Sequence, residues 1–324
     1  MSVREWLLPT WNRLAETLVQ GRPHHALLIA GPAGLGKREL ADALISSALC
    51  NQRRDDFSAC GRCKSCLLLA AGSHPDRILL TFEARAKPNE DKLRTELVVD
   101  QVRALSQRLA LSSQFGGLQL ALIDPAETLN ENAANALLKT LEEPTAASVM
   151  ILVCNDPSRL PATIRSRCQR IDVSIPARDL ALDWLRGKGL SAERSAMALD
   201  TVQGNPGAAW QLIEDGGLDL REQCQNDLVA LTRGRASALA IADGWAADRP
   251  EQRLWLAAIL ARDEARRIGI GEPGHFGLTR PTEIQKLAAW FGHANRVRRL
   301  LDTPVRSDLL LLDLMRGWPG SPNY

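Results

Sequence analysis

A short apolar run leads directly into a glycine-rich loop, and this junction leaves few possible folds. Residues 26–30 read Ala-Leu-Leu-Ile-Ala, and the eight residues after them read Gly-Pro-Ala-Gly-Leu-Gly-Lys-Arg. A strand, a glycine loop and a helix in this order are typical of a P-loop, because glycines let backbone N–H groups cradle phosphate oxygens at the positive end of a helix. The sequence therefore predicts a P-loop of nucleotide-binding ancestry, whose candidate binding residues are Gly31, Gly34, Gly36 and Lys37.

The residue after the P-loop lysine departs from the pattern. A working loop carries Ser or Thr there to hold Mg²⁺, whereas this chain has Arg38, which cannot ligate a cation. On this ground we expect no hydrolysis. Two interpretations stay open: a loop in which Lys37 still reaches the phosphates of a nucleotide, and a relic loop that supports the fold without a ligand.

Four of the seven cysteines cluster after the predicted P-loop helix, with the spacing C-x9-C-x2-C-x2-C. Four thiolates suit tetrahedral zinc, and the two short gaps let one knuckle offer two sulfurs to one ion. Because every ligand is a protein group, no position is left for water, so the predicted site is structural. Free cysteines, disulfides and an iron–sulfur cluster are the alternatives. The candidate ligands are Cys50, Cys60, Cys63 and Cys66.

Further along the chain, two apolar strands each end at a polar residue. They span 118–123 and 149–154, end at Asp124 and Asn155, and enclose a helix with one apolar face. A Ser-Arg-Cys triplet at 166–168 closes the run. Strand, acid, helix, strand, polar tip and triplet together resemble the AAA+ clamp-loader subunits of bacterial DNA polymerase III, and within them the delta-prime family.

The resemblance covers roughly the first two thirds of the chain and implies an α/β AAA+ fold with a RecA-like parallel sheet of the P-loop type. It implies a nucleotide-switch core over 1–172 with a zinc-binding insertion at 50–66. A small helical lid is expected over 173–210, and an all-α C-terminal collar domain over 211–324. The sequence by itself reads the last segment only as a helical bundle.

The same resemblance suggests roles for individual residues in the core and lid. Asp124 matches the magnesium-handling acid of an ATPase, but Pro125 stands where the catalytic Glu is expected, and Glu127 matches neither position. Asn155 matches a sensor of the γ-phosphate, with a turn-forming asparagine as the alternative. Gly207 stands where the lid of an ATPase carries a sensing arginine.

Arg167 is the candidate catalytic residue, and it would act in trans. In clamp loaders an arginine of the Ser-Arg-Cys motif faces the ATP of the next subunit. The planar, permanently charged guanidinium suits this task because it can stabilise a phosphoryl group in transfer. The alternative is a surface arginine in a basic patch with Arg165 and Arg170.

The three departures at positions 38, 125 and 207 favour a stator over a motor. The expected function is a hydrolysis-deficient stator subunit of the sliding-clamp loader, an accessory subunit of the polymerase holoenzyme without catalysis of its own. It would supply Arg167 to a neighbouring ATPase while the clamp is opened and loaded on primed DNA. The alternative is the ATP-hydrolysing gamma/tau-like motor subunit.

The resemblance also implies cofactors and partners. Expected partners are the gamma/tau ATPase subunits and the delta subunit in a pentameric ring, with the sliding clamp and primer-template DNA reached through the complex. We expect structural Zn²⁺. Arg38 disfavours binding of ATP with Mg²⁺, and both interpretations of the P-loop given above stay open.

Composition argues against several other classes. A net charge of +2 does not support a globally basic nucleic-acid coat, and 4% aromatic residues are few for stacking on bases. A zinc-binding DNA adaptor is therefore disfavoured, as is a small P-loop kinase, which the triplet and the cysteines do not suit. Apolar runs stay below the ~18 residues of a membrane span, and the N-terminus has no signal-peptide pattern, so we expect a cytoplasmic protein without membrane partners.

Overall fold

The chain divides into two units, Met1–Ala208 and Ala209–Tyr324, which we describe separately. The finer division into core, lid and collar stays a prediction. The computed structural model describes residues 3–19, 23–83, 95–145, 147–301 and 303–321.

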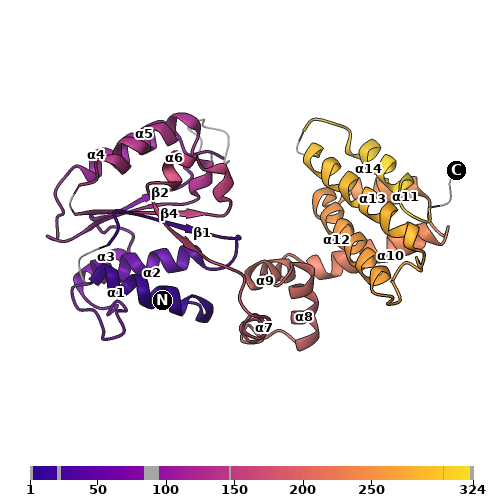
Figure 1. The fold of residues 1–324 in the computed structure, drawn as a ribbon, viewed down its shortest axis with the longest axis horizontal. Helices are drawn as coiled ribbons and strands as arrows, with labels where there is room; N and C mark the ends of the chain where they lie inside the picture. The colour runs from indigo at the N-terminus through magenta and orange to yellow at the C-terminus, as the bar shows by residue number, and fades with distance from the viewer. Residues whose placement is uncertain (1–2, 20–22, 84–94, 146, 302, 322–324) are drawn as a thin grey trace. The chain divides into compact units, whose positions relative to one another are not determined.

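A five-stranded parallel sheet forms the centre of the first unit, in the order β2-β3-β4-β1-β5 (Figure 1). Parallel strands end at the same edge, so the segments that follow β1, β3 and β4 meet there. These segments carry the P-loop, Asp124 and Asn155. The strands are β1 (Ala26–Ala30), β2 (Arg77–Leu80), β3 (Gln119–Ile123), β4 (Ser148–Cys154) and β5 (Gln169–Asp172).

Helices cover both faces of this sheet (Figure 1). One face carries α1 (Leu8–Val19), α2 (Lys37–Leu49) and the short α3 (Lys64–Ala70), and the other carries α4 (Val99–Leu109), α5 (Glu131–Glu142) and α6 (Ala162–Arg165). Single 3-10 turns are η1 (Glu5–Leu7), η2 (Ala126–Thr128) and η3 (Pro157–Arg159).

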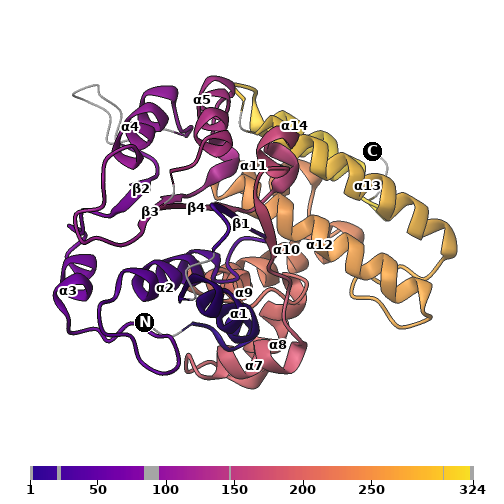
Figure 2. The ribbon, with the colours of Figure 1, turned by 60° about the vertical axis from the view of Figure 1, so that its left-hand side comes forward.

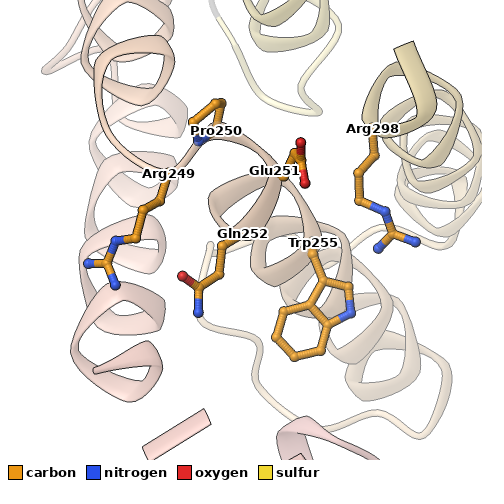
Figure 3. Close-up of a pocket in the computed structure, with 6 residues that line it drawn as sticks. All are labelled: Arg249, Pro250, Glu251, Gln252, Trp255 and Arg298. Atoms are coloured by element: carbon orange, nitrogen blue, oxygen red, sulfur yellow. The ribbon is translucent and has the colours of Figure 1, made fainter. Parts of the chain in front are cut away.

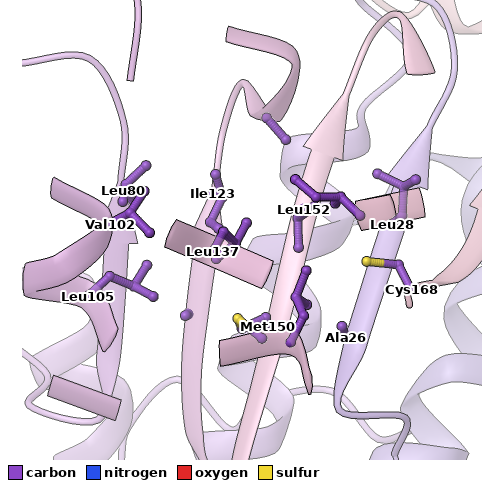
Figure 4. Close-up of a cluster of buried hydrophobic side chains, with 14 of the residues drawn as sticks. Ala26, Leu28, Leu80, Val102, Leu105, Ile123, Leu137, Met150, Leu152 and Cys168 are labelled. Atoms are coloured by element: carbon purple, nitrogen blue, oxygen red, sulfur yellow. The ribbon is translucent and has the colours of Figure 1, made fainter. Parts of the chain in front are cut away.

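The strands are apolar on both sides because each face of the sheet is buried. In β4, Met150 and Leu152 belong to the core under α4 and α5, whereas Val149 and Ile151 belong to the core under α1 and α2. Figure 4 shows the first of these cores, where side chains of β4 lie beside Leu137 of α5. The continuous apolar runs in the sequence are thereby explained.

The predicted amphipathic helix between β3 and β4 begins and ends as the sequence indicates. The Asn130 side chain caps α5 by accepting a hydrogen bond from the Ala133 N–H at 2.9 Å. Leu137 and Leu141 are buried against the sheet. Pro144 follows two residues after the helix end.

Three helices follow β5, and we call them the lid helices. Among the described residues after them, the second unit contains helices and no strand. Its helices α12 and α13 pack along each other (Figure 2). None of the helices within the described residues is long and apolar enough to cross a membrane. The lid helices are α7 (Arg178–Arg186), α8 (Ala192–Thr201) and α9 (Pro206–Glu214), and the others are α10 (Gly217–Thr232), α11 (Ala238–Ala247), α12 (Pro250–Gly269), α13 (Pro281–Leu300) and α14 (Ser307–Arg316).

Candidate functional site

The P-loop lies between β1 and α2, and its glycines are needed for close packing. Gly31 has a φ of 147° and Gly34 a φ of 82°, a region that favours glycine. A Cβ at Gly31 would collide with the carbonyl oxygen of Val173, and one at Gly34 would lie 3.0 Å from the Ala208 N. The loop is therefore pressed against the segment after β5 and against the start of α9.

The Lys37 ammonium is buried and already bonded to protein groups. Its side chain is only 4% exposed, and Nζ donates to the Pro32 carbonyl at 2.7 Å and to Asn155 Oδ1 at 2.8 Å. Burial lowers the pKa of Lys37, while the nearby carboxylates of Glu127 and Asp124 act in the opposite direction. The lysine thus joins the tip of β4 to the P-loop.

Glu127 completes this network, although its place in the sequence gave no indication of a role. Its Oε1 accepts hydrogen bonds from the Asn155 N at 3.1 Å and from Asn155 Nδ2 at 2.8 Å. Burial, with a further effect of Glu127, raises the pKa of the Cys154 thiol to about 12. Glu127 sits on η2, directly after β3, and it meets Asn155 because β3 pairs with β4, an adjacency that the sequence alone does not give.

Arg38 faces the carboxylate that would hold magnesium in an ATPase. Its Nη1 lies 2.7 Å from Asp124 Oδ2, and its Nε lies 2.8 Å from Asp42 Oδ2. Arg77 Nη2 pairs with the other oxygen of Asp42 at 2.8 Å. Burial opposes the charge of Arg38, but its hydrogen bonds to Asp124 and Asp42 leave the pKa of Arg38 raised.

Three cations and three carboxylates therefore meet around the P-loop, and we call them the P-loop ion cluster. Their formal charges cancel, so the cluster has no excess positive charge to attract a polyphosphate. Its members are Lys37, Arg38, Arg77, Asp42, Asp124 and Glu127.

The turn that begins α9 packs directly on the P-loop. Asn205 Nδ2 donates to the Ala33 carbonyl at 2.7 Å, and Asn205 Oδ1 accepts from the Ala208 N–H at 3.1 Å. A Cβ at Gly207 would overlap the backbone of Gly34. The position where an ATPase would carry its sensing arginine has no room for a side chain here.

An N-terminal segment contacts both the P-loop and the lid helices. Arg4 Nη1 donates to the Gly34 carbonyl at 2.5 Å, and Trp6 Nε1 donates to the Leu35 carbonyl at 3.0 Å. The Arg4 guanidinium lies 4.9 Å from the ring centre of Trp184 on α7, and the Trp6 and Trp184 rings meet edge to face at 5.7 Å. These contacts form a strap between the loop and α7.

The four clustered cysteines come together as their spacing predicts. Their Sγ atoms all lie within 4.8 Å of one another, and the pairs Cys50–Cys63 and Cys60–Cys66 are 3.9 Å apart. A tetrahedral ion with Zn–S bonds of ~2.3 Å needs S–S separations of about 3.8 Å. Disulfides would need ~2.05 Å, so the thiols are unlinked. The group fits a tetrahedral metal ion.

Backbone donors around these sulfurs favour thiolates. The Cys60 N–H donates to Cys50 Sγ at 3.3 Å, and the Cys63 N–H donates to Cys60 Sγ at 3.3 Å. Desolvation opposes the Cys63 thiolate, but backbone and thiol hydrogen bonds outweigh it and lower the pKa of Cys63 to about 6. Desolvation raises the pKa of Cys66 to about 12. The four thiols would not all ionise without a cation among them.

Arg167 lies between two buried anchors. Ile164 and Cys168 are 0% and 9% exposed in the core under α5 and α6, so the backbone of the triplet is fixed. The Arg167 side chain is 35% exposed. Its Nη1 donates to the Thr163 carbonyl at 2.9 Å, and its Nη2 pairs with Glu142 Oε1 at 2.6 Å. Glu142 is a second residue that the sequence did not single out.

The second unit has a pocket that the sequence did not predict. The pocket is about 540 Å³ in volume, and its wall combines the indole of Trp255 on α12 with the guanidinium of Arg298 on α13 (Figure 3). The remaining lining residues are Arg249, Pro250, Glu251 and Gln252.

Known proteins resemble this chain over most of its length. Residues 8–176 match the family described as DNA polymerase III, delta subunit. A DNA polymerase III subunit delta' from Pseudomonas aeruginosa is 38% identical over 244 residues, which cover 74% of this chain and 70% of that protein. This chain belongs to the delta-prime family of DNA polymerase III subunits.

Other relatives agree with this membership. The subunit delta' of Escherichia coli is 34% identical over 321 residues, or 96% of this chain and 93% of that protein. A solved gamma-subunit-related protein from Thermotoga maritima is 17% identical and covers 95% of this chain and 97% of its own, with a TM-score of 0.43, a likeness too distant to carry a conclusion. The predicted delta-prime resemblance is confirmed, and so is the predicted AAA+ fold with an all-helical C-terminal region.

Proposed function

We propose that this delta-prime family member is the stator of a sliding-clamp loader. In this role it would not hydrolyse ATP, and it would supply Arg167 to the ATP of a neighbouring ATPase subunit. Family membership supports the clamp-loader role. The single observation that carries the stator role is the ion pair between Arg38 and Asp124.

This ion pair opposes hydrolysis because phosphoryl transfer in a P-loop ATPase needs Mg²⁺ on the loop hydroxyl and the strand-end acid. Here the guanidinium of Arg38 occupies the acid instead, at 2.7 Å. Pro125 has no carboxylate to orient water, and Gly207 contacts the loop backbone where a sensing arginine would be needed. Each change removes a different part of the catalytic apparatus.

The surface position of Arg167 supports action in trans. The side chain is 35% exposed and is held by a carbonyl and a carboxylate rather than by a group of the P-loop ion cluster. An arginine finger must be presented from a rigid base to a phosphate on another chain, and the buried Ile164 and Cys168 provide that base.

The motor subunit remains the second candidate because the P-loop glycines and Lys37 are in place. Their geometry would suit a phosphate if the ion pairs around them opened. The cancelled charge of the P-loop ion cluster speaks against this function.

The remaining parts of the proposal concern zinc, partners and location. The four cysteines would bind one structural Zn²⁺, because the distances between their sulfurs fit tetrahedral coordination of this ion. Expected partners are the gamma/tau and delta subunits in a pentameric ring, with clamp and primed DNA reached through the complex. The cytoplasm is the expected compartment.

ATP turnover tests the proposal. We expect no turnover by the purified chain, and turnover when it is combined with its own species' ATPase subunit, delta subunit, clamp and primed DNA. Arg167→Ala should reduce the turnover of the assembly strongly, because an arginine finger contributes ~10³–10⁵ to the rate of the site that it serves. Arg170→Ala, a neighbouring exposed arginine, is the control and should leave turnover unchanged. Turnover by the chain alone that disappears in Lys37→Ala would instead establish the motor function.

A further inference from the structure

The Arg167 guanidinium is held at both of its Nη groups. One bond, to the Thr163 carbonyl, comes from its own turn, and the other comes from Glu142 on α5. The Nη2–Oε1 distance of 2.6 Å is typical of a strong charge-assisted hydrogen bond. Two separate elements, α5 and the turn after α6, therefore set the direction of this side chain.

Glu142 is itself firmly placed. It is the last residue of α5, and the preceding Leu141 is 2% exposed in the core. A carboxylate in the last turn of a helix faces the negative end of the helix dipole, so helix stability does not explain an acid here. Among the described residues, the partner of its side chain is Arg167, and pairing with that guanidinium is the interaction that this position provides.

Holding Arg167 leaves its guanidinium free to bind a further anion. An arginine has five N–H groups, and the hydrogen bonds found among the described residues use two of them. Three N–H groups remain, and the pair is open to solvent, with 35% of the arginine and 49% of the glutamate side chain exposed. A phosphate oxygen can thus be bound while the Glu142 bond persists.

We propose that Glu142 is the positioning residue of the arginine finger: it holds the Arg167 guanidinium in the direction from which it reaches the phosphates of a neighbouring subunit's ATP. This inference rests on the proposed function of Arg167. An unheld arginine must lose rotamer freedom when it meets the transition state, whereas a held one has already lost it.

The expected kinetic effect follows from this role. Glu142→Ala removes the ion pair with Arg167 and should lower kcat for clamp- and DNA-stimulated ATP turnover by on the order of tenfold. KM for ATP should stay nearly unchanged, because the neighbouring subunit still binds ATP through its own loop. Glu142→Gln keeps one acceptor oxygen and should recover most of the loss. Glu143→Ala is the matched control, since this adjacent exposed glutamate forms no side-chain hydrogen bond or ion pair with the residues that the structure describes.

The test uses the complete loader reassembled with each variant, beside Arg167→Ala and the double variant Arg167→Ala/Glu142→Ala. The double variant should be no slower than Arg167→Ala alone, because Glu142 acts only through the arginine. Equal melting temperatures of wild type and Glu142→Ala would exclude a folding defect as the cause.

The outcomes separate this inference from the proposed function. If Arg167→Ala leaves turnover intact, the proposed role of Arg167 as an arginine finger is wrong. If Arg167→Ala abolishes stimulation while Glu142→Ala matches wild type, only the positioning role is overturned. Faster turnover in Glu142→Ala would show competition for the guanidinium and would overturn the positioning role too. A double variant slower than Arg167→Ala alone would also overturn it.

Discussion

The guanidinium of Arg38 and the carboxylate of Asp124 lie 2.7 Å apart, in the place where an ATPase holds Mg²⁺. The neighbouring Lys37 contacts Asn155, the residue that would sense the γ-phosphate. At the scale of single residues, both cations of the loop have thus become partners of the protein's own side chains. Replacing either cation should therefore lower the stability of the fold rather than ATP turnover.

Lys37→Ala should destabilise the chain even without nucleotide. The change leaves Asn155 Oδ1 without its donor and removes the positive charge beside the buried Glu127. Hydrogen bonds to charged groups contribute about 1.5–3 kcal/mol, so the free energy of unfolding should fall by that amount in urea titrations. Lys139→Ala, an exposed lysine on α5, is the control and should have little effect. An unchanged midpoint in Lys37→Ala would show that the network contributes nothing.

At the scale of elements, the cysteine module is attached to the sheet through side chains. The Ser65 hydroxyl on α3 donates to the Leu49 carbonyl at 2.6 Å and contacts His74 Nε2 at 2.6 Å. His74 Nδ1 accepts from the Asp76 N–H at 3.1 Å, and since the hydroxyl proton is already used, Nε2 is the donor. The module thereby supports the start of β2, and its loss should reach the core.

If the four cysteines hold zinc as proposed, Cys60→Ser should release it and lower the melting temperature by roughly 5 °C or more. Each ~1 kcal/mol of lost stability corresponds to about 2–4 °C in a chain of this size. Metal content by plasma emission spectroscopy and thermal melting by circular dichroism measure the two effects. Lys64→Ala, at the start of α3 and next to Cys63, should keep the metal. Wild-type protein that is as stable without zinc as with it would contradict the structural role.

The order of strands and helices could be predicted because apolar runs, glycine loops and capping residues are local signals. The cysteine group could be predicted for the same reason: the spacing of 60, 63 and 66 alone brings three thiols near one ion. The contacts of Glu127 and Glu142 could not, because each depends on which strand or turn lies beside it in the fold. A single sequence contains no direct record of such neighbours.

At the scale of the first unit, the strap joins two parts that move relative to each other in a nucleotide-driven enzyme. Arg4 and Trp6 bind the P-loop carbonyls and meet Trp184 on α7. Asn205 adds a bond from the turn before α9. Protein side chains therefore connect the loop directly to the lid helices, which suits the proposed stator role.

Trp6→Ala should loosen α7. Edge-to-face ring pairs contribute about 0.5–1.5 kcal/mol, and ~1.4 kcal/mol corresponds to a tenfold change in an opening equilibrium. We expect amide hydrogen exchange in α7 to accelerate by up to about tenfold, while β3 and β4 exchange as in wild type. Glu5→Ala, an exposed neighbour, should leave exchange unchanged. Unaltered protection of α7 in Trp6→Ala would mean that the strap does not restrain it.

A cation that is covalently part of a chain cannot dissociate. Because Arg38 rather than Mg²⁺ neutralises Asp124, the charge at this place does not depend on the concentration of free magnesium, on chelators or on the exchange of ligands. In the proposed clamp loader, neighbouring subunits that bind and release metal-bound ATP would alternate between charge states. If this chain is the proposed stator, the charge at its own P-loop would stay the same throughout that cycle.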